Sequence, residues 1–186
     1  TETKIANNPV SVVSLAERKL RDYKLDRNSR ILIIGSGETN TNLSKYLVKQ
    51  GFTNFTIFNR TVNNAEKLAK IIQSAAVKAT AFPLDQLENY QGGFDVLVTC
   101  TASPDKIITP ELFAKLKGAD VNTKVIVDLS VPSNISTEVL EANKANVIDV
   151  NELKEIASAN LEERQSEYVA AEELIEENIK NFRQLH

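Results

Sequence analysis

Residues 31–40 read Ile31-Leu32-Ile33-Ile34-Gly35-Ser36-Gly37-Glu38-Thr39-Asn40, and this stretch decides the fold. Four aliphatic residues run into two glycines, and a helix-compatible segment, 41–50, follows at once. A strand, a tight glycine turn and a helix in this order bring a pyrophosphate against free N–H groups at a helix N-terminus. Gly35 would allow the turn, and Gly37 would let the backbone approach the phosphates. We therefore expect a dinucleotide to bind at Gly35, Ser36, Gly37, Glu38, Thr39 and Asn40.

The segments around this stretch alternate between strand and helix patterns. Strands are expected at 30–34, 55–58, 76–82, 94–99, 124–129 and 146–150, the third interrupted by Pro83. Helices are expected at 9–23, 41–50, 62–73, 84–90, 110–117 and 136–143. This alternation predicts an α/β fold with right-handed crossovers and a doubly wound parallel sheet. Six strands match the two halves of a Rossmann-like dinucleotide-binding domain, which we assign to 25–151, after a lead-in and amphipathic helix at 1–24.

The last segment, 152–186, differs from the rest because it contains neither glycine nor proline. As a helix it would be about 50 Å long, more than such a domain can cover. A coiled-coil-like seam with alternating spacings of three and four comprises Leu161, Arg164, Tyr168, Ala171, Ile175, Asn178, Phe182 and Leu185. One interpretation is a helix that packs back onto the sheet with a solvated acidic face. The interpretation that we favour is a protruding, truncated connector or dimer-forming helix.

Composition excludes several classes of protein. The chain has 186 residues, 42% of them hydrophobic, and a net charge of −3, whereas a nucleic-acid binder of the whole-surface kind should be basic. No stretch approaches the roughly 20 apolar residues that span a bilayer, and no secretory signal opens the chain, so we expect no membrane partner. A single cysteine cannot form an internal disulfide, which predicts a cytoplasmic location. Cys100 and the terminal His186 cannot supply a metal site. Because the chain starts at Thr1 and has no methionine, we expect a fragment or a processed product.

The end of the second strand indicates which dinucleotide binds. Sites for NAD usually place Asp or Glu there, and a carboxylate would repel a 2′-phosphate. This chain has Asn59-Arg60-Thr61, a donor-rich set suited to the phosphate of NADP. The same three residues also fit an ordinary turn with Thr61 as the N-cap of the next helix, and both interpretations can hold together.

The loop after the fourth strand, Thr99-Cys100-Thr101-Ala102-Ser103-Pro104, should lie beside the nicotinamide half of the dinucleotide. Small hydroxylic residues there contact the ribose or amide without blocking the ring; the alternative is a plain polar loop. Cys100 has no histidine to form a catalytic pair, so we assign no catalytic residue to this chain and take Cys100 as a cofactor-lining or buried residue. Asp128, at the end of the fifth strand, either anchors the backbone or faces the cofactor.

Five groups of short segments, taken in order, have a specific combined spacing. They are Gly35-Ser36-Gly37-Glu38-Thr39, Asn59-Arg60-Thr61 with Ala65-Glu66-Lys67-Leu68-Ala69, Thr101-Ala102-Ser103-Pro104, Val127-Asp128-Leu129-Ser130-Val131-Pro132 with Asn134-Ile135, and Asn160-Leu161-Glu162-Glu163-Arg164. Together they resemble glutamyl-tRNA reductase, from Val10 onward. Asn40 departs from the small residue usual in that family, which we expect to alter helix packing more than cofactor contact.

The resemblance implies an NADPH-binding domain and the start of the long spinal helix of an enzyme of tetrapyrrole (haem) synthesis. In that family a cysteine of an N-terminal domain attacks glutamyl-tRNA, and a hydride from NADPH releases glutamate 1-semialdehyde. A C-terminal domain forms the homodimer. The resemblance thus implies that this chain lacks both domains and is inactive alone. Two rivals remain: a shikimate-dehydrogenase-like NADP-dependent reductase, which also uses an Asn-Arg-Thr turn, and a non-catalytic dinucleotide sensor that dimerises through the helix. The Val131-Pro132 segment and the long helix disfavour the first.

Overall fold

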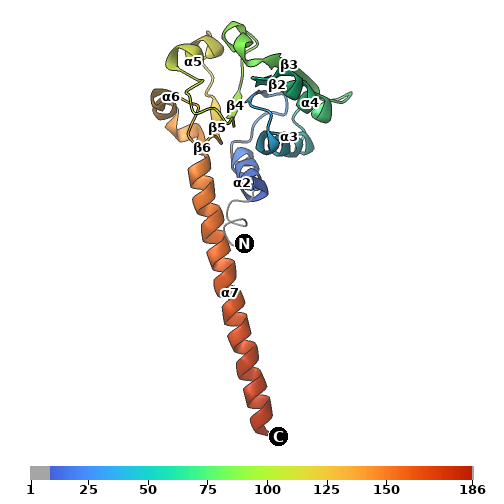
Figure 1. The fold of residues 1–186 in the computed structure, drawn as a ribbon, viewed down its shortest axis with the longest axis vertical. Helices are drawn as coiled ribbons and strands as arrows, with labels where there is room; N and C mark the ends of the chain where they lie inside the picture. Colours follow the sequence, from blue (N-terminus) through green and yellow to red (C-terminus); the bar gives the residue numbers. More distant parts are fainter. Residues whose placement is uncertain (1–8, 186) are drawn as a thin grey trace.

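The computed structural model describes residues 9–185, so the part of the expected lead-in at 1–8 lies outside the described residues. A parallel sheet of six strands is flanked by helices, and one long helix leaves it (Figure 1). The strand order is β3-β2-β1-β4-β5-β6, which confirms the doubly wound, Rossmann-like fold. The strands are β1 Arg30–Ile34, β2 Asn54–Asn59, β3 Lys78–Pro83, β4 Val96–Thr99, β5 Val125–Asp128 and β6 Val147–Asp149.

Two hydrophobic cores lie on the two faces of this sheet. The helices that bury them are α2 Pro9–Asp22, α3 Glu38–Lys49, α4 Val62–Ile72, α5 Pro110–Lys117, α6 Thr137–Ala142 and α7 Val150–Leu185, with the short 3₁₀ helices η1 Leu84–Asn89 and η2 Lys144–Asn146. Helices α2, α3, α4 and the start of α7 contribute to one core. Helices α5 and α6 and η1 contribute to the other.

Strand β1 explains why one stretch of sequence decides the fold. Ile31 and Ile33 belong to the first core, whereas Leu32 and Ile34 belong to the second. All four are buried, because β1 is a central strand whose two faces are both covered. A strand in that position needs a continuous apolar run instead of an alternating pattern. Burial of each side chain contributes roughly 1.5–3 kcal/mol.

The structure corrects two of the expected boundaries near the glycine turn and the sheet edge. Helix α3 begins at Glu38, not at residue 41, with Gly37 as its N-cap. The hydrogen bond from Thr41 N to Gly37 O, 2.9 Å long, closes its first turn. Strand β3 continues through Pro83, which is paired with Asn59 in the register of β2. Proline is tolerated there because β3 is an edge strand and Pro83 is its last residue.

The remaining elements lie within a few residues of expectation. Helix α7 begins at Val150 instead of 152, because the Asp149 carboxylate accepts a hydrogen bond of 2.7 Å from Asn151 N and so supports an earlier start. Strand β4 begins at Val96, not at 94. The segment expected as a short helix after Pro83 is the 3₁₀ helix η1. Differences of this size are usual at element ends.

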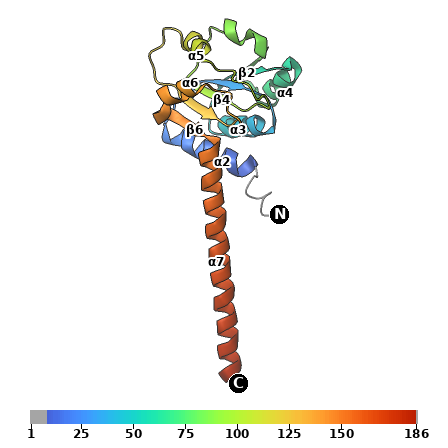
Figure 2. The same ribbon diagram turned by 60° about the vertical axis from the view of Figure 1, so that its left-hand side comes forward.

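Helix α7 leaves the domain instead of packing back onto the sheet, and both views show it pointing away (Figures 1 and 2). Val150 and Leu153 are buried in the first core, and the Lys19 ammonium of α2 forms an ion pair of 3.0 Å with Glu152. From residue 162 to residue 180 every side chain is exposed. The expectation that the helix protrudes is therefore confirmed, whereas its role as a connector or dimer-forming helix stays a prediction. Among the described helices none is both long and apolar enough to cross a membrane.

Candidate functional site

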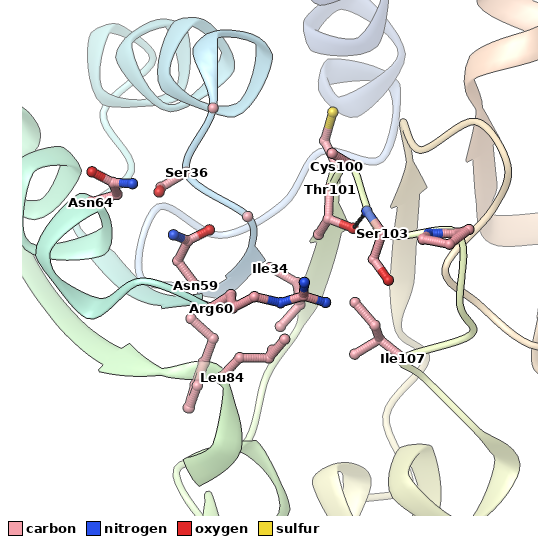
Figure 3. Close-up of a pocket in the computed structure, with 15 residues that line it drawn as sticks. Ile34, Ser36, Asn59, Arg60, Asn64, Leu84, Cys100, Thr101, Ser103 and Ile107 are labelled. Atoms are coloured by element: carbon pink, nitrogen blue, oxygen red, sulfur yellow. Dashed lines mark hydrogen bonds between the residues drawn. The ribbon is translucent and has the colours of Figure 1, made fainter.

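A pocket of about 420 Å³ lies at the carboxyl ends of β1, β2 and β4 (Figure 3). The order of the strands reverses between β1 and β4, and ligands of open α/β sheets bind at such a point. Fifteen residues line the pocket: Ile34, Gly35, Ser36, Gly37, Phe58, Asn59, Arg60, Asn64, Leu84, Cys100, Thr101, Ala102, Ser103, Pro104 and Ile107.

The two glycines of the turn between β1 and α3 differ in backbone conformation and in the space around them. Gly35 has a φ of +102°, and a Cβ there would lie 2.1 Å from the carbonyl oxygen of Cys100. Gly37 has an ordinary φ of −72°, and a Cβ added to it would meet nothing within 4 Å. Gly35 is thus required by the fold, whereas Gly37 faces open space. No side chain caps α3, so the N–H groups of its first turn remain available for an anion.

Three residues of the expected phosphate-binding stretch, Glu38, Thr39 and Asn40, do not line the pocket. Asn40 is 1% exposed and points inward. Its Nδ2 donates hydrogen bonds to the carbonyl oxygens of Ile34 at 3.1 Å and Gly35 at 2.9 Å. The dinucleotide-binding fingerprint G-x-G-x-x-G has its third glycine at this position. Asn40, which takes its place, therefore joins α3 to the end of β1. Direct contact of these three residues with a cofactor stays a prediction.

The end of β2 presents donors and a positive charge. Among the fifteen lining residues, Arg60 carries the one charged side chain, and none is a carboxylate. Asn59 Nδ2 donates a hydrogen bond of 2.9 Å to the carbonyl oxygen of Thr61, which stabilises the turn into α4. Thr61 is the N-cap residue, although its hydroxyl makes no capping hydrogen bond, and it does not line the pocket. The turn and the pocket are thus built from the same segment.

The loop after β4 forms the opposite wall of the pocket. Cys100, Thr101, Ala102 and Ser103 line it, as expected. Thr99 does not: it is buried, and its hydroxyl donates a hydrogen bond of 3.3 Å to the Asp128 carboxylate. Thr99 therefore does not face the pocket but joins the start of this wall to the end of β5.

Asp128 is an anchor and does not line the pocket. Besides Thr99, the Ser133 hydroxyl donates to its carboxylate at 2.6 Å. Burial raises the pKa of Asp128, and these hydrogen bonds act in the opposite direction. Of the two roles considered for this residue, the structure shows the structural one, in which Asp128 ties the end of β5 to β4 and to the loop before α6.

The thiol of Cys100 is poorly suited to nucleophilic attack. Burial raises its pKa; a hydrogen bond with the Thr39 side chain acts in the opposite direction, and the nearby Asp128 carboxylate raises the pKa as well. A raised pKa keeps the sulfur protonated and unreactive at neutral pH. Within residues 9–185, no three His, Cys, Asp or Glu side chains are grouped so as to hold a metal ion.

Several lining residues were not predicted. Asn64 lies in the first turn of α4, three positions after Thr61, and points toward Asn59 and Ser36 in Figure 3. The register of the expected helix would have placed it on that side. The apolar floor, formed by Ile34, Phe58, Leu84 and Ile107, could not be assembled beforehand, because Leu84 and Ile107 follow different strands and meet only in the folded sheet.

This sheet order, with an uncapped helix behind a glycine turn, defines a Rossmann-like dinucleotide-binding domain of the NAD(P)-dependent oxidoreductases. Residues 14–156 match the sequence model of the shikimate / quinate 5-dehydrogenase family, and the chain belongs to that family.

Individual relatives are more specific. Over 98% of its length the chain is 31% identical to a glutamyl-tRNA reductase of Picosynechococcus sp., and it spans 42% of that protein. A Pseudomonas aeruginosa glutamyl-tRNA reductase is 34% identical over 99% of this chain and 43% of its own length. The solved glutamyl-tRNA reductase of Methanopyrus kandleri matches 89% of this chain and 41% of its own, with 27% identity and a TM-score of 0.66. The chain is thus homologous to the dinucleotide-binding domain of these enzymes, which confirms the resemblance.

Proposed function

We propose that this chain is the NADPH-binding part of a glutamyl-tRNA reductase, which reduces glutamyl-tRNA to glutamate 1-semialdehyde in tetrapyrrole synthesis. The assignment of NADPH as the cofactor rests on the pocket lining at the end of β2, where Arg60 is charged and no carboxylate is present. A 2′-phosphate is attracted by such a guanidinium and would be repelled by the acid that NAD sites place there. The substrate class rests on the relatives, which align over nearly the whole chain.

The residues of the pocket fit the parts of NADPH in order. The open space at Gly37 and the uncapped start of α3 suit the pyrophosphate. Arg60, with Asn64 beside it, suits the adenosine 2′-phosphate. Thr101 and Ser103, on the β4 side of the switch point, suit the nicotinamide ribose and amide. When bound, NADPH would supply a hydride; this chain's own residues bind and orient it.

In this proposal, the attack of a cysteine on the glutamyl ester of the tRNA takes place outside residues 9–185. Cys100 lines the dinucleotide pocket, its pKa is raised, and the chain's one histidine is His186. A thiol in that setting does not attack an ester efficiently. We infer that another part of the protein supplies the cysteine and holds the tRNA, and that α7 connects this domain to the part that forms a homodimer. The isolated chain should therefore not reduce glutamyl-tRNA.

The direct test compares NADPH and NADH binding to the wild type, Arg60→Ala and Arg18→Ala. Arg18 is an exposed arginine of α2 outside the pocket, so it controls for loss of charge alone. We expect Arg60→Ala to weaken the binding of NADPH by about tenfold or more, because charge-assisted hydrogen bonds are worth about 1.5–3 kcal/mol. Its affinity for NADH should not change, and Arg18→Ala should bind both cofactors as the wild type does. Equal affinity of the wild type for both cofactors would contradict the assignment of the 2′-phosphate site.

A second candidate is a shikimate- or quinate-oxidising dehydrogenase, favoured by the family model that matches residues 14–156. That match ends before the exposed part of α7, whereas the glutamyl-tRNA reductases align over 98% of the chain or more. Incubation with NADP and either shikimate or quinate tests it: formation of NADPH would favour this candidate.

The third candidate is a non-catalytic sensor that dimerises through α7. Sedimentation of the whole chain and of a chain without residues 165–186, each with and without NADPH, tests it. A dimer that forms only with the helix would support a sensor, and we expect monomers.

A further inference from the structure

A buried amide outside the pocket holds the pocket wall that follows β4. Thr101 and Ser103 line the pocket, whereas Asn134, in the loop between β5 and α6, is 0% exposed and does not line it. The proposed function gives Asn134 no role, although its side-chain amide makes four hydrogen bonds and its carbonyl oxygen accepts two more.

Both polar atoms of the Asn134 amide are fully used. Nδ2 donates one hydrogen bond to the carbonyl oxygen of Ser103 and one to that of Asp105, each of 2.9 Å. Oδ1 accepts from the hydroxyl of Thr101 at 2.7 Å and from that of Ser130 at 2.5 Å. A side-chain amide offers two donors and two acceptor positions, so these four partners saturate it. No other side chain of this size presents two donors and two acceptor positions.

The two hydroxyl groups carry the network on to the main chain of the wall. Each hydroxyl has one hydrogen, and both hydrogens are given to Asn134 Oδ1. Their lone pairs then accept from N–H groups: Ser130 Oγ from Thr101 N at 3.1 Å, and Thr101 Oγ1 from Ser103 N at 3.2 Å. Every hydrogen in this arrangement has one acceptor, so the orientation of the whole network follows from the amide of Asn134.

The main chain of Asn134 holds the far end of the same segment. Its carbonyl oxygen accepts from the N–H groups of Ile107 at 2.7 Å and Ile108 at 2.9 Å. Ile107 is itself part of the pocket floor. Residues 101–108 are therefore attached to Asn134 at both ends.

The position of this wall sets the width of the pocket beside the glycine turn. A Cβ on Gly35 would lie 2.1 Å from the carbonyl oxygen of Cys100 and 3.2 Å from Cγ2 of Thr101. The turn and the wall are thus already in contact, and a shift of either one changes the space between them. Arg60, Asn59 and Asn64 lie on the other side of the pocket (Figure 3).

We propose that Asn134 is a positioning residue for the nicotinamide half of NADPH, acting through the wall at residues 101–105. The proposal rests on the proposed function, because the dinucleotide places its adenosine half on the β2 side and its nicotinamide half on the β4 side. Removal of the amide leaves two hydroxyls and two carbonyls without their partners. Residues 101–105 are then no longer held in place beside the nicotinamide half, whereas the residues on the β2 side keep their contacts with the adenosine half.

The experiment measures two affinities for each variant: that of NADPH, and that of 2′,5′-ADP, which contains only the adenosine half with its 2′-phosphate. The variants are Asn134→Ala and the control Asn143→Ala. Asn143 also donates an amide hydrogen bond, to Val139 O at 2.8 Å, but lies at the end of α6. We expect Asn134→Ala to weaken NADPH by about tenfold or more and 2′,5′-ADP by less than about twofold. Asn143→Ala should change neither affinity.

A merely structural role would give a different pattern, because a smaller folded fraction weakens both ligands equally. Equal weakening of both ligands, or no weakening of either, would overturn the proposal while the proposed function stands. If the wild type binds neither probe, the proposed function fails, and this inference fails with it. Circular dichroism shows whether Asn134→Ala folds. If it does not, Ser130→Ala, which removes one partner of Asn134 Oδ1, must show the same split in smaller degree, and its absence would overturn the proposal.

Discussion

The side-chain amide of Asn40 donates a hydrogen bond of 2.9 Å to the carbonyl oxygen of Gly35 and so ties the glycine turn to its helix. A residue in the place of the fingerprint's third glycine thus supports the turn from inside. The arrangement has a cost, because Asn40 Oδ1 is buried and has no hydrogen-bond partner among the described residues. An unpaired buried acceptor costs roughly 1–3 kcal/mol, which partly offsets the two bonds that the Nδ2 atom makes.

The effect of substituting Asn40 on the free energy of unfolding should therefore depend on whether the new side chain keeps a hydrogen-bond donor, and not on its volume. We expect Asn40→Ala to lower the free energy of unfolding by about 1–2 kcal/mol, since two hydrogen bonds are lost but an unpaired oxygen is removed as well. Asn40→Asp, although nearly isosteric, should cost more, because at neutral pH a carboxylate would face the carbonyl oxygens of Ile34 and Gly35. Urea unfolding at pH 7 measures both. An Asp variant as stable as the wild type would show that these two bonds contribute nothing.

The two glycines of the turn should respond in opposite ways to alanine. Gly35→Ala places a Cβ at positive φ and against the carbonyl oxygen of Cys100, so we expect a loss of about 3 kcal/mol or failure to fold. Gly37→Ala meets no atom and should change stability by less than about 1 kcal/mol. It should nevertheless weaken NADPH by about tenfold or more, because the methyl group occupies the space proposed for the pyrophosphate. Thermal melts and NADPH titration separate the two effects; unchanged NADPH binding by Gly37→Ala would contradict the phosphate assignment.

The sequence was sufficient for the fold class, a doubly wound parallel sheet of six strands, because the decisive signals are local. The apolar run into Gly35 marks a doubly covered central strand, and the handedness of crossovers then leaves few topologies. The lining residues of the glycine turn, of the turn after β2 and of the loop after β4, such as Gly35, Arg60 and Thr101, could be predicted for the same reason. Leu84 and Ile107 could not, because nothing local joins them. The role of Asn134 could not be predicted either, since three of its four side-chain partners lie some thirty positions away and reach it only through the pairing of β4 with β5.

Acid should destabilise the chain partly through Asp95, which directly precedes β4 at the end of the strand opposite the pocket. Its carboxylate accepts hydrogen bonds from Arg30 N at 2.7 Å and from Arg30 Nη2 at 3.0 Å. These bonds lower the pKa of Asp95, so the unfolded chain binds the proton more readily than the folded one. The stabilisation is complete above the unfolded value of about 3.9 and is lost as the pH falls through the lower pKa of the folded state.

We expect Asp95→Asn to cost about 1–3 kcal/mol at pH 7 and less at about pH 2, because the wild type loses the stabilisation from this carboxylate as the pH falls below the unfolded value. Urea unfolding at the two pH values measures the difference. Glu176→Gln, on the exposed part of α7, is the control and should change neither value. A constant difference between Asp95→Asn and the wild type at both pH values would show that the ion pair does not set the acid dependence.

Cys100 should react slowly with maleimides at neutral pH. Burial raises the pKa of its thiol, so the thiolate fraction is small and grows as the pH rises. Because Cys100 lines the proposed dinucleotide pocket, NADPH should slow the reaction further. The chain has one cysteine, so mass spectrometry follows the site directly. A rate equal to that of a free thiol would contradict the burial of this side chain. A rate that NADPH does not change would place Cys100 outside the occupied pocket.

The exposed part of α7 should be dispensable for the stability of the domain, whereas its first turn should not. Val150 and Leu153 are buried in the core beside α2, and the side chains from residue 162 to residue 180 are all exposed. A chain that ends at Leu161 should melt within about 2 °C of the whole chain, since each kcal/mol shifts the midpoint of a domain this size by about 2–4 °C and few contacts are removed. It should also lose helical signal in the far ultraviolet. Leu153→Ala should instead cost about 2–5 kcal/mol, the usual cost of emptying a buried leucine site. A large drop in the melting temperature of the shortened chain would mean that the protruding helix folds back onto the sheet in solution.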